Sequence, residues 1–168
     1  IITSMCHHYS FSFDEAYSKL VDVNASLSEK SANGDCSNFT YLGSWAEHYK
    51  SWKNTKAFKV LFIRYEDLQN EKYEIFKKII NFINNLKNDN SIIDENKLSN
   101  SIKSTNFANL KNKEFTQNFE ESVYSKDGKK INFFNLGFKN KGQKLLPKDM
   151  VDKINNSLEK ELLDLKYL

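Results

Sequence analysis

Residues 59–83 read KVLFIRYEDLQNEKYEIFKKIINFI, and this stretch decides the expected fold. The segment 59–63, KVLFI, is short, almost continuously apolar and partly β-branched, which is typical of a strand buried on both faces of a parallel sheet. A helical pattern follows over about 71–86, and it is expected to bury Ile75, Phe76, Ile79, Ile80, Phe82 and Ile83. A strand that leads into a helix indicates an α/β unit, so we expect an α/β fold with at least one central parallel strand.

Tyr65 leaves the carboxyl end of this expected strand, where open α/β sheets bind ligands. Its ring can lie against a base while its hydroxyl donates a hydrogen bond. Glu66 and Asp67 follow, and three roles are open to them: capping the next helix, holding a lysine, or acting in catalysis. We favour capping and orientation, because acidic residues are preferred at helix starts.

Most of the remaining chain has helical patterns. Ser12 with Glu15 and Ser44 with Glu47 are spaced as capping boxes, which predict two helix starts. The first of these helices places Phe13, Ala16, Tyr17, Leu20 and Val21 on one face, and the second carries a stripe of Trp45, Tyr49 and Trp52 that we interpret as core packing.

Further predictions concern two helices and two loops in the rest of the chain. A helix is expected over about 94–103, and the last helix is expected to begin near Pro147. That last helix is expected to bury Met150, Val151, Ile154, Leu158, Leu162 and Leu165. The polar stretch 24–40 is expected to be a loop, and 111–132 a long mobile loop with a turn at Asp127-Gly128.

Composition excludes several classes of protein. The 168 residues suit one domain, and a formal net charge of +3 is too small to indicate nucleic-acid binding. No apolar run reaches the about 18 residues that span a membrane, and the first residues do not form a signal peptide. Cys6 and Cys36 have no CxxC spacing, so we interpret them as free thiols of a reducing, cytoplasmic protein. His7 and His8 have no metal-ligand partner at useful spacing, so no metal is expected.

The chain resembles the later half of the sulfotransferases that use 3'-phosphoadenosine 5'-phosphosulfate (PAPS). The resemblance rests on an ordered set of segments: GSWAEHYKSW (43–52), KVLFIRYEDL (59–68), FANL (107–110), FFNLG (133–137) and PKDMVDKINNSLEKELLDLKYL (147–168). It implies a P-loop-like three-layer fold with a central parallel sheet, here N-terminally truncated and mostly helical. Residues 1–168 would then be the C-terminal part of a single sulfotransferase-like domain.

The resemblance also implies five cofactor-binding residues. Ser4, in SMCHHY, matches the family's serine for the 3'-phosphate, although a capping or exposed serine is commoner. Tyr65 looks like the tyrosine that contacts adenine, and Thr105 and Phe107 look like the family's threonine and phenylalanine at the nucleoside. Gly137 matches the glycine of the phosphate segment. A purine needs flat apolar faces and a few polar edges, which these side chains provide, while ordinary core and turn roles are the alternative.

The sequence departs from the family pattern in two ways. Asn135 and Leu136 stand where the family has basic residues that hold the 3'-phosphate, so Lys139, Lys141 and Lys144 are candidate replacements. The family's phosphosulfate-binding loop, its catalytic histidine and its Arg-x-Pro motif are not found in these 168 residues. The catalytic groups are therefore expected upstream of Ile1, and the chain is either a fragment or a degenerate relative.

Three functions follow. The leading hypothesis is a sulfotransferase that moves a sulfuryl group from PAPS to a hydroxyl or amine of a small-molecule or glycan acceptor. This chain would supply part of the nucleotide pocket, and the loop at 111–132 would cover that pocket. The alternative is a non-catalytic interaction module with the same fold. A third idea is a helical domain that binds acidic polymers through its lysines, but the many acidic residues argue against a basic face.

Overall fold

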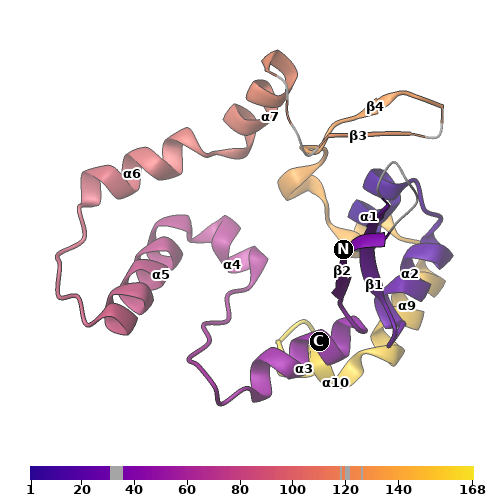
Figure 1. Ribbon diagram of the computed structural model, residues 1–168, viewed down its shortest axis with the longest axis horizontal. Helices are drawn as coiled ribbons and strands as arrows, with labels where there is room; N and C mark the ends of the chain where they lie inside the picture. Colours follow the sequence, from indigo (N-terminus) through magenta and orange to yellow (C-terminus); the bar gives the residue numbers. More distant parts are fainter. Residues whose placement is uncertain (31–35, 118, 120–121, 126) are drawn as a thin grey trace. The chain divides into compact units, whose positions relative to one another are not determined.

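The computed structural model describes residues 1–30, 36–117, 119, 122–125 and 127–168, with the side chains of 27–30 and 36–38 left out. The described part is mostly helical, with ten α-helices, one short 3₁₀ helix and two small antiparallel sheets (Figure 1). It divides into two compact units. The first comprises Ile1–Phe58, Val123–Ile131 and Asn140–Leu168, and the second comprises Lys59–Ser122 and Asn132–Lys139.

The first unit has a helical core. Its helices are α1 (Ile2–Tyr9), α2 (Phe13–Val21), α3 (Trp45–Asn54), α8 (Gly142–Leu145), α9 (Lys148–Ser157) and α10 (Glu159–Asp164). Helix α2 packs against α1, α3 and α9. Ile2, Ala16, Leu20 and Leu158 form the buried centre, and Trp45 packs against it. The expected apolar face of α2 and the packing role of Trp45 are confirmed, whereas Trp52 at the other end of the stripe is 45% exposed.

Both predicted capping boxes are present. At α2, the amide of Glu15 donates to Ser12 Oγ (3.2 Å), and the Ser12 amide donates to Glu15 Oε2 (2.7 Å). At α3, the Glu47 amide donates to Ser44 Oγ (3.2 Å), and the Ser44 amide donates to Glu47 Oε2 (3.3 Å). Each box satisfies amides that have no partner within the helix, which explains why both helices begin where the sequence predicts.

The predicted loop at 24–40 is wrong in part. Strands β1 (Ser26–Lys30) and β2 (Cys36–Tyr41) pair antiparallel, with Ser26 opposite Tyr41. The carbonyl of the buried Ala25 accepts from the amides of Leu42 (2.8 Å) and Gly43 (3.0 Å) and so closes the base of this hairpin. The stretch is polar and lacks the alternating apolar residues that would predict a strand. The two strands are held together by hydrogen bonds between their backbones.

The C-terminal helical region begins at Pro147 as predicted but is divided. Helix α9 ends at Ser157, the backbone of its C-cap Leu158 leaves the helical region (φ −123°, ψ 19°), and α10 follows directly. Of the six apolar residues expected to be buried, Met150 and Leu158 are buried, and the other four are partly exposed.

Three side-chain contacts link α10 to α3. Lys50 Nζ lies 2.6 Å from Oε1 of the buried Glu161, and both Tyr49 and Lys53 donate to Asp164. The salt bridge with Lys50 holds the pKa of Glu161 below its ordinary value. The Lys53 ammonium likewise lowers the pKa of Asp164, and the hydrogen bond to Asp164 raises the pKa of the Tyr49 phenol.

The second unit contains helices and no strand among its described residues. It comprises α4 (Tyr65–Asn70), α5 (Lys72–Lys87), α6 (Glu95–Ser104), α7 (Phe107–Thr116) and a 3₁₀ helix (Gly137–Lys139). The helix expected over 94–103 is confirmed as α6, which is linked to α5 by Lys77 and Glu95 (2.9 Å). The prediction of a loop over 111–132 is wrong for 111–116, which belong to α7. It is also wrong for β3 (Val123–Tyr124) and β4 (Lys130–Ile131), which pair antiparallel in the first unit. Its turn at Asp127-Gly128 is confirmed, because the Gly128 amide donates to the Ser125 carbonyl (2.9 Å).

The central parallel sheet is not seen in the described residues. Both sheets there have two antiparallel strands, and residues 59–63 belong to neither. The physical reason is that a buried strand needs strands beside it to accept and donate its backbone hydrogen bonds, and no described segment does so here. Helix α5, which follows, has no buried residue, and Ile83 is 41% exposed. The helix prediction itself is confirmed, and the mostly helical expectation holds.

Candidate functional site

Helix α7 carries three residues that contact the segment 133–137. Its N-cap is Asn106, whose side-chain oxygen accepts from the Asn109 amide (2.8 Å). Phe107, Lys111 and Glu114 follow at spacings of four and three residues, so they share one face of the helix. All three side chains contact the FFNLG segment, which makes α7 the element that positions it.

Phe107 and Gly137 are in direct contact. The Phe107 ring lies edge-on to Phe134, with centroids 5.9 Å apart and an interplanar angle of 79°. Gly137 has φ +51°, and a Cβ atom placed there would lie 2.5 Å from Cε2 of Phe107. Position 137 therefore accommodates no side chain while the ring keeps its place.

Lys111 places a positive charge beside the same segment. Its ammonium donates to the backbone carbonyl of Asn135 (2.8 Å) and lies 5.9 Å from the centroid of the Phe107 ring. Lys111 is exposed, so the ammonium remains accessible. The sequence predictions missed this residue. Its spacing of four residues from Phe107 was the available signal, because residues four apart are neighbours on a helix.

Glu114 is the buried acid of this region, with 3% of its surface exposed. Its Oε2 accepts from the amide of Phe134 (2.9 Å), and its Oε1 accepts from the amide of Phe133 and from Ser122 Oγ (3.0 Å). The sequence predictions missed Glu114 as well, because nothing in a surface-like run of lysines and asparagines marks one glutamate as buried.

Thr105 and Tyr65 belong to the same unit. Thr105 is the C-cap of α6, two residues before Phe107, and its exposed hydroxyl donates to the Ser101 carbonyl (2.6 Å). Its lone pairs remain available to a donor. Tyr65 is the first residue of a different helix, α4, and is 52% exposed.

Glu66 and Asp67 lie in the first turn of α4. The capping role favoured for them is not seen, because Arg64 is the N-cap and no side-chain cap hydrogen bond is present. Their place in the first turn still complements the positive end of the helix dipole.

Ser4 lies in the other unit, in the first turn of α1. It is exposed, and its Oγ accepts from Asn140 Nδ2 (3.0 Å), while Thr3 Oγ1 donates to Asn140 Oδ1 (2.5 Å). The N-cap of α1 is Ile1, so Ser4 is not the cap. The first-turn amides of a helix lack partners within it and point toward any ligand at this end.

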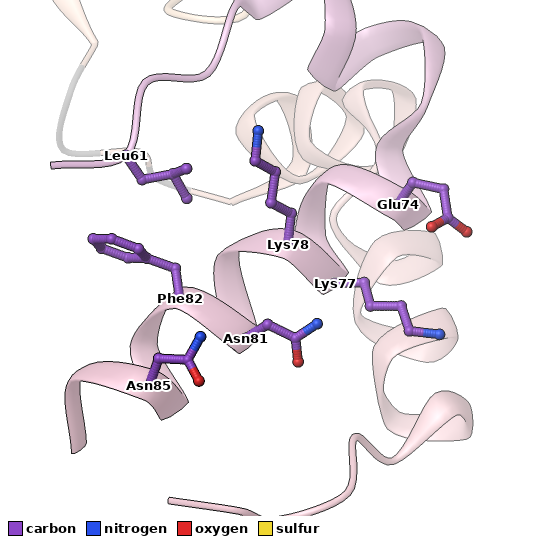
Figure 2. Close-up of a pocket in the computed structure, with 7 residues that line it drawn as sticks. All are labelled: Leu61, Glu74, Lys77, Lys78, Asn81, Phe82 and Asn85. Atoms are coloured by element: carbon purple, nitrogen blue, oxygen red, sulfur yellow. The ribbon is translucent and has the colours of Figure 1, made fainter. Parts of the chain in front are cut away.

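A separate cavity of about 480 Å³ lies on α5 in the second unit (Figure 2). It is lined by Leu61, Glu74, Lys77, Lys78, Asn81, Phe82 and Asn85. None of the five residues predicted to bind the cofactor is among them.

No group of three or more potential metal ligands occurs within the described ranges. In that same part of the chain, no helix is both long and apolar enough to cross a membrane. Lys139, Lys141 and Lys144 are all exposed.

These observations define a predominantly helical protein whose candidate site combines aromatic rings, a glycine without room for a side chain, and an accessible ammonium. The family model of the sulfotransferase domain matches residues 2–166, and the chain belongs to this family. Comparison with curated proteins and comparison with solved structures gave no match.

Proposed function

We propose that this chain is part of a sulfotransferase that moves a sulfuryl group from PAPS to a hydroxyl or amine of a small-molecule or glycan acceptor. The observation that carries this proposal is the match to the sulfotransferase domain over residues 2–166. Within the family, this chain would supply part of the nucleotide pocket. The P-loop-like fold with a central parallel sheet, which the described residues do not contain, is kept only as part of this proposal.

The base side of the pocket is assigned to Tyr65, Thr105 and Phe107. Tyr65 is 52% exposed, so its ring is accessible to a purine face. The Thr105 hydroxyl already donates to Ser101, so it would act as an acceptor toward an exocyclic amine. Phe107 lies two residues further along and offers a second apolar surface.

The phosphate side is assigned to Gly137 and Ser4. The Phe107 ring fills the space that a side chain would take at Gly137, so this position would offer only its backbone to a phosphate. Ser4 offers a hydroxyl and a first-turn amide at the start of α1, which suits an anion. Asn135 and Leu136 stand where the family has basic residues. Lys139, Lys141 and Lys144 would supply the missing positive charge.

PAPS would supply the activated sulfuryl group, which an acceptor displaces in line. Transfer of this kind depends mostly on positioning and on stabilising developing charge. The residues described here hold and orient the nucleotide portion. No residue of this chain is assigned as the catalytic base.

The test is calorimetric titration of the full-length protein with 3',5'-ADP, the desulfated product. We expect saturable binding that protects the protein against thermal unfolding and that Tyr65→Ala weakens. Lys87→Ala, at the end of α5, is the matched surface control and should leave binding unchanged. A protein that remains folded but shows no binding of this nucleotide would refute the proposal.

A non-catalytic interaction module is the second candidate. It is favoured by one observation, the presence of Asn135 and Leu136 at positions where the family has basic residues. The two candidates differ in transfer of the sulfuryl group and in binding of the nucleotide. A sulfotransferase transfers labelled sulfate from PAPS to an acceptor from a panel of phenols, alcohols, amines and glycans, whereas the module transfers none and does not bind 3',5'-ADP.

A further inference from the structure

The buried carboxylate of Glu114 holds two consecutive backbone amides. The amides of Phe133 and Phe134 donate to its two different oxygens, Oε1 and Oε2. Successive amides of an extended chain point in opposite directions, so two that converge on one carboxylate require a turned backbone. A further hydrogen bond, from the Asn135 amide to the Phe133 carbonyl (3.1 Å), tightens the same turn.

This turn leads directly into Gly137. The glycine lies three residues after Phe134, with φ +51° and its Cα against the Phe107 ring. Glu114 and Phe107 are seven residues apart on α7, so one helix face fixes the segment at both ends. The Glu114 carboxylate determines the direction of the backbone before Gly137. The Phe107 ring determines how closely the backbone at Gly137 can approach α7.

We infer that Glu114 is a positioning residue that keeps the segment 133–137 in its nucleotide-binding conformation. The inference rests on the proposed function, which assigns Gly137 to the phosphate side of the pocket. Glu114 touches no substrate in this scheme. It acts through the backbone that it orients, so its loss should change the recognition of the phosphate more than that of the base.

A carboxylate is specifically required. Both oxygens of an ionised glutamate accept hydrogen bonds, whereas a glutamine offers one acceptor and one donor. In Glu114→Gln, the amide nitrogen would face a backbone N–H, so one of the two consecutive hydrogen bonds is lost and two donors are left opposed. The volume of the side chain is nearly unchanged, which separates this effect from loss of packing.

The experiment compares two nucleotides on the full-length protein: 3',5'-ADP and 5'-AMP, which lacks the 3'-phosphate. The preference for 3',5'-ADP is the ratio of the two dissociation constants. In Glu114→Gln we expect this preference to fall by about tenfold to a hundredfold, while the affinity for 5'-AMP changes little, because a displaced segment would lose about one hydrogen bond to the charged 3'-phosphate. Ser122→Ala is the matched control, since it removes a side-chain donor to the carboxylate but neither amide bond, and it should keep the wild-type preference.

The outcomes distinguish the two proposals. If wild-type protein binds no 3',5'-ADP, the proposed function and this inference both fail. If wild-type protein prefers 3',5'-ADP and Glu114→Gln keeps the same preference, only the role of Glu114 is refuted. A variant with lower stability but unchanged preference would also show that Glu114 is purely structural.

A second measurement does not depend on the folding of any variant. In the wild-type protein without ligand, the amide hydrogens of Phe133 and Phe134 should exchange slowly with solvent, because both N–H groups donate to the buried Glu114 carboxylate. Exchange at the rate of an unstructured chain at both amides would overturn the inference.

Discussion

Replacing Gly137 with alanine tests the geometry of the candidate site. The added Cβ would lie 2.5 Å from Cε2 and 2.7 Å from Cδ2 and Cζ of Phe107, closer than side-chain carbons approach one another in folded proteins. The ring or the segment must therefore shift. The ring is also packed edge-on against Phe134, which restricts its movement.

The expected cost has two parts. Holding a residue with a Cβ at φ +51° costs about 1–2 kcal/mol, and overpacking against the ring adds about 1–3 kcal/mol. Gly137→Ala should therefore lower the free energy of unfolding by about 2–5 kcal/mol. Gly128→Ala is the matched control, because Gly128 has φ +74° but no atom within 4 Å of the added Cβ. The control should lose only about 1–2 kcal/mol, and any effect of alanine on the unfolded chain is common to both variants.

Urea unfolding followed by far-UV circular dichroism measures both variants under the same conditions. Adding Phe107→Ala to Gly137→Ala should relieve the overlap, giving a coupling free energy of about 0.5–3 kcal/mol in favour of the double variant. Equal destabilisation by Gly128→Ala and Gly137→Ala, with no coupling to Phe107, would show that the ring does not limit position 137.

Three further predictions concern the first unit. Ser44→Ala removes the acceptor at the start of α3 and should lower the free energy of unfolding by about 1 kcal/mol in urea, whereas Ser44→Asp keeps an acceptor and should lose less. Lys50→Met removes the partner that lowers the pKa of Glu161. A carboxylate whose pKa is lowered by folding stabilises the protein above its unfolded-state pKa, and this stability is lost as the pH falls through its folded-state pKa. The variant should therefore lose about 1 kcal/mol at neutral pH and less below about pH 4, and a loss independent of pH would contradict this reasoning. Asp164→Asn should return the raised pKa of Tyr49 toward its ordinary value in an ultraviolet absorbance titration, with Tyr49→Phe identifying the transition; an unchanged titration would contradict the hydrogen bond.

The local features of this protein were predictable from its sequence. The capping boxes at Ser12 and Ser44, the helix at Glu95–Ser104, the turn at Gly128 and the helix start at Pro147 are all present. Each depends on hydrogen bonds between residues a few positions apart, so the residues that decide the structure are adjacent in the chain.

The strand predictions were less successful for a related reason. The apolar run 59–63 reads as a buried strand, but the described residues provide no neighbour to pair with it, and it forms no strand there. The polar stretch that contains Ser26–Lys30 reads as a loop but pairs with Cys36–Tyr41. A strand is defined by its partner, and the partner cannot be read from the strand itself.

The candidate site shows the same division. Family resemblance in the sequence identified Phe107 and Gly137, and the structure then showed that they touch. Glu114 gave no recognisable pattern, because a glutamate on a helix usually faces solvent. Lys111 gave no signal beyond its spacing of four residues from Phe107. Only the folded chain brings the Glu114 carboxylate to amides 19 and 20 residues away.

The sequence by itself determined the family of this protein and the helices whose ends are capped by their own residues. The tertiary structure alone decided which residues of α7 support the FFNLG segment and which acids are buried. The physical reason is range: a cap satisfies amides within one turn of the same helix, whereas a buried carboxylate is stable only where distant backbone donors meet it.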